Sequence, residues 1–298
     1  MTLSAATTGA LVRAGLDPAR VLDVAARALA EDLDGGEDVT SVATVPAELR
    51  GVAAFVPRAD GTLAGLGVAM AVLDVGVPGV ELRALADDGD AVGRGRPVLA
   101  ATGPVRSLLT AERTALNLLC HLSGIATLTA TWVDAVAGTG VRVRDTRKTT
   151  PGLRALEKHA VRCGGGVNHR MSLSDAALVK DNHVVAAGGV AAAFAAVRER
   201  FPGVPVEVEC DTVDQVREVV AAGADLVLLD NMTTDDLRAS VALCRAAGVL
   251  TEASGGLSLD VARAVAETGV DFLAVGALTH SAPVLDLGLD LTTDRGTA

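Results

Sequence analysis

The residues best suited to chemistry in this chain are basic and lie close together in sequence. The window from Arg142 to Lys180 holds nine Lys or Arg and three Asp or Glu, a local balance of +6 in a chain of net charge −11. It also holds every lysine of the chain: Lys148, Lys158 and Lys180. Guanidinium and ammonium groups are common ligands of carboxylates and phosphates, so the window predicts an anion pocket. The alternative is a solvated helix face with a few ion pairs.

A glycine triplet, Gly164-Gly165-Gly166, lies inside this window, and Asn168, His169 and Arg170 follow it closely. Glycine permits positive φ and close approach of a ligand to the backbone. The stretch therefore predicts a loop that presents polar side chains to a bound anion. The alternatives are that the first glycine only caps a helix over about 152–163, and that His169 is a hydrogen-bonded core histidine.

Two acidic residues, Glu209 and Asp230, end otherwise aliphatic runs. A carboxylate is costly to bury unless it meets a cation or a metal. This pair is expected to bind Mg²⁺ that bridges a phosphorylated substrate, or to stabilise positive charge on a reacting carbon. A structural pairing with nearby arginines is the alternative.

Two glycine-containing segments, Ser254-Gly255-Gly256 and Gly276-Ala277-Leu278, lie one strand-plus-helix unit apart. Backbone N–H groups in such loops, at the start of a helix, form anion sites. Barrel enzymes often bind a phosphate in the loops after their last two strands. The pair therefore predicts a phosphate site. No zinc-protease, serine-hydrolase or Walker A motif is present.

The elements that must position these residues are short aliphatic runs that alternate with helical stretches. The chemistry-bearing residues Glu209, Asp230, Glu252 and Gly276 follow at spacings of 21, 22 and 24 residues, the length of one strand, one helix and two loops. This period predicts a buried parallel sheet closed into a (β/α) barrel, with function at the carboxyl ends of the strands. A doubly wound open sheet is the alternative. The expected strands are 141–144, 177–180, 206–209, 226–229, 249–251 and 272–275.

The first third of the chain predicts a mixed α+β unit. Asp17-Pro18 begins a helix that runs to about Leu33, because Asp is a good N-cap and Pro is favoured at the first helical position. Strands are expected at 52–56 and 80–85, with a turn at 87–90. A helical region is expected from 107 to 137, with a break near Ser123-Gly124.

Composition narrows the class of protein further. The net charge of −11 makes nucleic acids and anionic membranes poor partners. The four scattered cysteines indicate reduced thiols, and no signal peptide is visible, so a soluble cytoplasmic protein is expected. The uncharged stretch from Thr114 to Val133 contains eight Thr, Asn, His, Ser or Gly residues, which favours buried helices over a membrane span.

Several ordered motifs resemble the quinolinate phosphoribosyltransferase family. The match runs from about Asp32 to Leu287. Its segments are 111–117 (AERTALN), 145–151 (DTRKTTP), 164–170 (GGGVNHR), 178–183 (LVKDNH), 208–210 (VEC), 229–232 (LDNM), 252–256 (EASGG) and 275–280 (VGALTH). After Arg170 the family often has a glycine where this chain has Ser172, which would be strained if that position required a positive φ.

The resemblance implies an N-terminal α/β sandwich domain, residues 1–116, which the tail 281–298 can join. It also implies a C-terminal open (β/α) TIM-like barrel, residues 117–280. It implies a homodimer that joins quinolinate to 5-phosphoribosyl 1-pyrophosphate with Mg²⁺, giving nicotinate mononucleotide, pyrophosphate and CO₂. The rivals are a paralogue acting on another heterocycle and a non-catalytic phosphate-binding protein.

The resemblance also implies roles for individual residues. Arg113 would reach into the partner subunit's site, and Arg147, His169 and Arg170 would hold the quinolinate carboxylates. Lys148 and Lys180 would face both substrates, and Glu209 and Asp230 would bind the ribose and the metal. The 5-phosphate would be held by Ser254, Gly255, Gly256, Gly276, Ala277 and Leu278.

Overall fold

A computed structural model of the chain describes residues 2–293 and 296–297 and divides into two compact units. The first unit comprises Met1–Leu128, Thr150–Gly165 and Ser281–Ala298, and the second comprises Thr129–Thr149 and Gly166–His280. The contacts therefore assign residues 117–128 and 150–165 to the first unit, whereas the expected boundaries, 1–116 and 117–280, place them in the second. In the expected tail, residues 294–295 and 298 lie outside the described residues.

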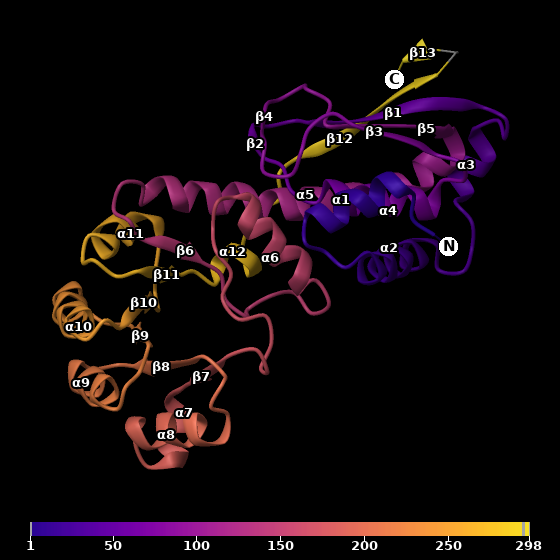
Figure 1. Ribbon diagram of the computed structural model, residues 1–298. Coiled ribbons are helices and arrows are strands. Elements are labelled where there is room, and N and C mark those ends of the chain that lie inside the picture. The colour runs from indigo at the N-terminus through magenta and orange to yellow at the C-terminus, as the bar shows by residue number, and fades with distance from the viewer. Residues whose placement is uncertain (1, 294–295, 298) are drawn as a thin grey trace. The chain divides into compact units, whose positions relative to one another are not determined.

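The first unit is an α/β sandwich, with an antiparallel sheet in one layer and helices in the other (Figure 1). The sheet order is β13 (Gly296–Thr297), β12 (Leu287–Thr293), β1 (Arg50–Pro57), β5 (Leu99–Pro104) and β3 (Glu81–Ala84). The tail thus joins this unit by pairing β12 with β1. The other elements are α1 (Ala5–Arg13), α2 (Pro18–Leu33), α3 (Val39–Thr44), β2 (Gly61–Thr62), α4 (Leu66–Gly76), β4 (Ala91–Val92) and α6 (Arg154–Cys163).

Helix α2 begins and ends where the sequence predicts. The Asp17 side chain accepts a hydrogen bond from Ala19 N at 2.9 Å, and Pro18 occupies the first helical position. Its buried residues Val21, Ala25 and Leu29 recur every four residues, which places them on one face. That face packs against α4.

Helix α5 (Val105–Ala135) is continuous, so the expected break near Ser123-Gly124 is wrong. The Ser123 hydroxyl bonds to the backbone N and O of Ala64, both at 3.1 Å. A Cβ at position 124 would collide with the Pro283 carbonyl oxygen and lie 2.9 Å from the Val284 Cα. The glycine therefore serves close packing of another chain segment rather than a helix end.

The composition of α5 also satisfies a membrane-span test. Among the described residues it is the one helix long and apolar enough to cross a membrane, and 56% of its most apolar window is buried within the protein. Leu108, Leu119 and Leu122 are fully buried. Such burial is typical of a core helix, in agreement with the sequence-based preference for buried helices.

The second unit holds a parallel six-stranded sheet in the order β6 (Arg142–Arg144), β11 (Phe272–Ala274), β10 (Leu250–Ser254), β9 (Leu226–Asp230), β8 (Val206–Cys210) and β7 (Ala177–Val179). From β7 to β11 each strand is added beside its predecessor, and β6 pairs with β11. This single winding excludes the doubly wound alternative, which requires a reversal of strand order. The curved, unclosed sheet is the expected open barrel.

The helices of this unit lie along the outer side of the sheet (Figure 1). They are α7 (Asp181–Ala187), α8 (Val190–Arg200), α9 (Val213–Ala221), α10 (Thr234–Ala246) and α11 (Leu259–Ala266). The short helix α12 (Ala277–His280) follows the carboxyl end of β11. All six expected strands are confirmed, but β10 extends three residues beyond its predicted end at Thr251. Glu252 therefore lies inside a strand rather than after it.

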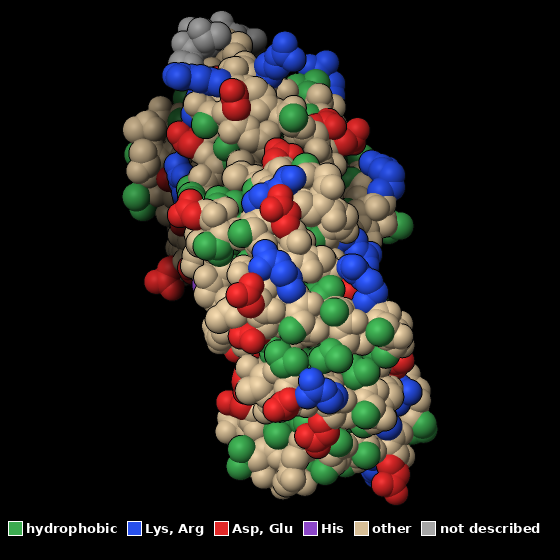
Figure 2. Space-filling view, turned by 90° about the vertical axis from the view of Figure 1, so that its left-hand side faces the viewer, with side chains coloured by type: hydrophobic (Ala, Val, Ile, Leu, Met, Phe, Trp, Pro, Cys, Tyr) green, Lys and Arg blue, Asp and Glu red, His purple; other side chains and the backbone are tan. Residues whose placement is uncertain are grey.

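The face of the molecule in Figure 2 is mixed in charge. Figure 2 shows Lys or Arg and Asp or Glu side chains interspersed on the viewed face, with no continuous basic patch among the residues described there. The four cysteines, all in the described part of the chain, are free thiols.

Candidate active site

A cavity of about 540 Å³ lies in the second unit at the carboxyl ends of the barrel strands. Ten predicted residues line it: Arg147, Lys148, His169, Arg170, Lys180, Glu209, Asp230, Ser254, Gly255 and Gly256. The remaining lining residues are Thr146, Leu178, Leu228, Asn231, Glu252 and Ala274. The geometry thus gathers four cations and three acids from six segments of the chain around one space.

Two arginines of this cavity have donors without partners. The Nε atoms of Arg147 and Arg170 are buried and make no hydrogen bond within the described part of the chain. Arg170 is anchored because its Nη1 donates to Ala176 O at 2.8 Å. Burial, and then the charge of Arg147, lower the pKa of Arg170. Partly buried guanidinium groups with unpaired donors, close enough to repel each other, indicate a site built for an anion.

The two lysines are positioned differently. Lys180 Nζ lies 3.0 Å from Glu209 Oε2, and its side chain is half exposed whereas that of Glu209 is 12% exposed. The backbone of Lys148 is fixed on both sides, since its N–H donates to Thr146 Oγ1 at 3.0 Å and its carbonyl accepts from Thr279 Oγ1 at 2.8 Å. Lys180 is therefore held by its carboxylate partner and Lys148 by its backbone, and the side chains of both remain accessible to a ligand.

His169 and Glu252 line the cavity and belong to a buried cluster that also includes Glu207, a residue the sequence did not single out. His169 Nδ1 accepts from Arg170 N at 2.7 Å, and its Nε2 lies 2.7 Å from Glu207 Oε2 and 3.7 Å from Glu252 Oε1. Arg144 Nη1 donates to Glu252 Oε2 at 2.6 Å. His169 therefore matches the core-histidine alternative. Its predicted contact with a ligand carboxylate requires exchange of one of these bonds.

Burial raises the pKa of Glu207 and of Glu252 to about 7 in each case. Repulsion from Glu207 is the second cause of the raised pKa of Glu252. The positive charge of Arg144 lowers the pKa of both groups and so opposes the shift. One oxygen of each carboxyl group, Oε1, has no hydrogen-bond partner among the described residues. A signal for these residues exists in the sequence, because Glu207 and Glu252 precede Glu209 and Ser254 by two positions and so share their face of the strand.

The loop after β10 is interlocked with the loop after β9. Gly255 has φ +86°, and a Cβ there would collide with the Asn231 side chain and lie 2.9 Å from its backbone N. Asn231 itself has φ +53°, and its N–H donates to Ser254 O at 3.0 Å. Only glycine at 255 accommodates both the left-handed conformation and this contact.

The second predicted phosphate loop is placed differently. Gly276, Ala277 and Leu278 do not line the cavity, and the Leu278 side chain is fully buried because α12 packs it into the core. Gly276 supports the site indirectly, since a Cβ there would lie 3.0 Å from Lys148 Cδ.

The glycine triplet and two further predicted positions also lie apart from the cavity. Gly164 caps α6, as the helix-cap alternative predicts, and the triplet does not line the cavity. Ser172 has no positive φ, and its N–H donates to Asp175 Oδ1 at 3.0 Å, so the loop forms without that strain. Arg113 is exposed on α5 in the first unit. Its predicted reach into a partner's site stays a prediction.

The fold and the cavity together define a class: a barrel enzyme whose site at the strand ends takes a multiply charged, phosphate-bearing anion. Comparison with known proteins agrees. Residues 38–123 match the family description "Quinolinate phosphoribosyl transferase, N-terminal domain", and residues 125–290 match the corresponding C-terminal domain. The chain therefore belongs to the quinolinate phosphoribosyltransferase family.

Individual relatives cover most of the chain. The nicotinate-nucleotide pyrophosphorylase [carboxylating] of Mycobacterium leprae is 53% identical over 273 residues, covering 90% of this chain and 96% of that protein. The crystal structure of NadC from Streptococcus pyogenes has a TM-score of 0.89 and 39% identity, covering 93% of this chain and 98% of that one. The structure of the nicotinate-nucleotide pyrophosphorylase from Francisella tularensis has a TM-score of 0.89 and 36% identity, covering 93% of this chain and 97% of that one.

Proposed function

We propose that this protein is a pentosyltransferase that moves the phosphoribosyl group of 5-phosphoribosyl 1-pyrophosphate to the ring nitrogen of quinolinate. The products are nicotinate mononucleotide, pyrophosphate and CO₂, a step of NAD biosynthesis. The observation that carries this proposal is the pair of buried, partnerless Nε donors of Arg147 and Arg170 in one cavity. The names "carboxylating" and "decarboxylating" among its relatives describe this reaction read in opposite directions.

The cations allow two anions to meet. Quinolinate is a dianion and the phosphoribosyl donor carries more charge, so their approach requires nearby positive groups. Arg147 and Arg170 bind the two carboxylates, because guanidinium forks match carboxylate geometry. Lys148 and Lys180 lie between the two substrates, and the backbone of Ser254-Gly255-Gly256 holds the 5-phosphate.

The carboxylates act at the ribose. When the bond from C1 to pyrophosphate breaks, positive charge develops on C1, and Glu209 and Asp230 stabilise it. The same carboxylate oxygens suit Mg²⁺, which when bound would neutralise charge on the leaving pyrophosphate. In the second step the bond to the carboxylate carbon breaks, the quaternary ring nitrogen stabilises the electron pair left on the ring, and a proton replaces CO₂.

The site is completed across a homodimer in this proposal, with Arg113 of one subunit serving the cavity of the other. Arg113→Ala and Lys180→Ala should each abolish turnover, and mixed dimers should recover up to about a quarter of it if subunits exchange at random. Demonstrated exchange without recovery would refute shared sites. We also propose a cytoplasmic location, on the free thiols and the acidic composition.

The reaction is tested by assaying purified protein for nicotinate mononucleotide formation with Mg²⁺. Turnover with quinolinate supports the proposal. Turnover only with another heterocyclic base would identify the paralogue instead, and phosphoribosyl pyrophosphate binding without any turnover would identify a binding protein. Metal removal with a chelator should abolish activity, and added Mg²⁺ should restore it.

A further inference from the structure

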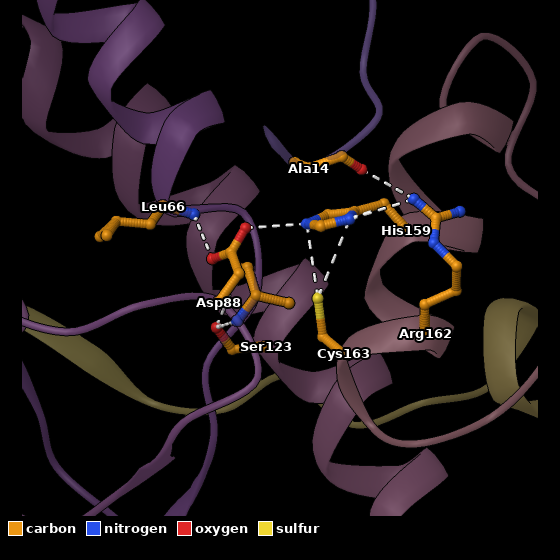
Figure 3. Close-up of polar contacts among 8 residues, drawn as sticks. Ala14, Leu66, Asp88, Ser123, His159, Arg162 and Cys163 are labelled. Carbon is orange, nitrogen blue, oxygen red and sulfur yellow. Dashed lines mark hydrogen bonds and ion pairs between the residues drawn. The ribbon is translucent and has the colours of Figure 1, made fainter. Parts of the chain in front are cut away.

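A second cluster of reactive side chains lies in the first unit, apart from the cavity described above. It contains Asp88, His159 and Cys163 (Figure 3). His159 and Cys163 are four residues apart on α6 and so share one face of the helix, while Asp88 lies in the turn between β3 and β4. His159 is buried, with 6% of its side chain exposed, and that of Asp88 is 17% exposed.

The three side chains converge on one point. His159 Nε2 lies 2.8 Å from Asp88 Oδ2 and 3.4 Å from Cys163 Sγ. One oxygen, one nitrogen and one sulfur atom of the set all lie within 4.8 Å of one another. None of these residues is used by the proposed reaction.

The arrangement is not that of a thiol nucleophile with its base. Such a triad needs the acid on one ring nitrogen of histidine and the thiol on the other. Here the thiol lies closer to Nε2, the nitrogen that faces Asp88, than to Nδ1, at 3.9 Å. Burial also raises the pKa of Cys163 to about 12, which disfavours a free thiolate.

We propose that Asp88, His159 and Cys163 form a binding site for a divalent transition metal of the Zn²⁺ class. Carboxylate oxygen, imidazole nitrogen and cysteine sulfur are the three ligand types that Zn²⁺ prefers. With bonds of about 2.0 to 2.3 Å, tetrahedral ligand atoms lie about 3.3 to 3.8 Å apart. The Nε2–Sγ distance of 3.4 Å falls in this range. Because Sγ also lies 3.9 Å from Nδ1, the sulfur sits over the face of the imidazole ring (Figure 3). Metal binding therefore requires the Cys163 side chain to rotate toward the ring plane, and the Asp88–His159 distance to open by about half an ångström as the metal replaces the shared proton.

The surroundings fit a three-ligand site with an open position. The other oxygen of Asp88 accepts from Leu66 N at 2.9 Å, which fixes the carboxylate in the way that outer hydrogen bonds fix metal ligands. A cavity of about 710 Å³, lined by all three residues, provides space for water or a small anion as fourth ligand. The carboxylate and a metal-bound thiolate together balance the two charges of the ion.

Other charged groups around this cavity are Arg13 of α1, Asp87 of the turn and Arg162 of α6. Arg162 Nη2 lies 3.4 Å from His159 Nδ1 and donates to Ala14 O at 2.8 Å. Its side chain is exposed, so it can turn toward solvent when the imidazole binds a metal through Nε2 and carries its proton on Nδ1.

The test is titration of the metal-free full-length protein with Co²⁺, followed by displacement with Zn²⁺. A thiolate-to-cobalt charge-transfer band should reach a plateau at one ion per chain, and Zn²⁺ should abolish it. The band reports sulfur ligation, so cobalt bound by Glu209 and Asp230 does not produce it. Cys163→Ser should eliminate the band, and His159→Gln or Asp88→Asn should weaken cobalt binding at least tenfold.

The matched control is Cys120→Ser, which removes another partly buried thiol of the same unit and should leave the band unchanged. A measurement on the unaltered chain guards against misfolded variants: Zn²⁺ should protect Cys163 from alkylation, mapped by peptide mass, and leave Cys120 labelled. Absence of the band and of protection would overturn the proposal, as would a band that survives in Cys163→Ser. Because nicotinate mononucleotide formation is assayed separately, failure here leaves the proposed function intact.

Discussion

The buried carboxyl group of Glu207 should make the stability of the barrel unit depend on pH. Burial raises its pKa from 4.5 to about 7. A carboxyl group with a raised folded-state pKa contributes most favourably below the unfolded value, and this contribution is lost as the pH rises through the folded value. Glu207→Gln keeps the shape and can still accept a hydrogen bond from His169, but it does not ionise.

The size of the effect follows from the shift. A difference of about 2.5 pKa units corresponds to a total loss of about 3 kcal/mol in the free energy of unfolding as the pH rises. About 2 kcal/mol of this loss occurs between pH 5.5 and pH 8.5. The free energy of unfolding of Glu207→Gln, relative to the unaltered protein, should therefore increase by about 2 kcal/mol over that interval. Removal of the Glu207 charge also lowers the pKa of Glu252, which acts in the same direction.

Tryptophan fluorescence can follow the unfolding of the unit that contains Glu207. Trp132 is the sole tryptophan, is buried, and lies in the same unit as Glu207, so its fluorescence during urea unfolding reports on that unit. Glu199→Gln, on the exposed surface of α8, controls for loss of one negative charge. A stability difference between Glu207→Gln and the unaltered protein that stays the same at both pH values would refute the reasoning.

Three further predictions concern the site and the core. Gly255→Ala should raise the KM for 5-phosphoribosyl 1-pyrophosphate at least tenfold. Gly256→Ala should raise it less, because a Cβ at position 256 would lie 3.9 Å from its nearest atom. Equal effects of the two substitutions would count against the interlocked loops. Gly124→Ala should lower the unfolding free energy by about 2 kcal/mol despite the higher helix propensity of alanine, and a thermal melt showing stabilisation would contradict the packing argument. Glu209→Gln and Asp230→Asn should lower kcat at least about 100-fold while changing quinolinate affinity, measured by calorimetry, less than threefold.

The barrel was predictable because its strands are aliphatic runs at a regular period, and that period places their carboxyl ends together. Ten of the expected site residues meet in one cavity for this reason. Glu207 escaped because only the last residue of each run, such as Glu209, was expected to bear chemistry, although Glu207 lies two positions earlier on the same face of β8. Glu252 was expected to bear chemistry, but at the end of its strand rather than inside it.

Other differences arise from contacts between segments distant in sequence. A glycine pattern alone did not reveal that Gly124 accommodates the backbone near Pro283, or that Leu278 packs inward rather than toward a ligand. Likewise, the basic character of residues 154–162 indicated the anion pocket, whereas α6 contacts the first unit and places its histidine and cysteine beside Asp88. Local sequence specifies elements, but only the assembled chain specifies their neighbours.

The scarcity of lysine has a practical consequence for studying this enzyme. Lys158 is fully buried, so the primary amines that a water-soluble acylating reagent can reach on side chains are those of Lys148 and Lys180, both beside the same cavity. Mass-resolved labelling of the native protein would thus measure occupancy of the cavity almost free of background.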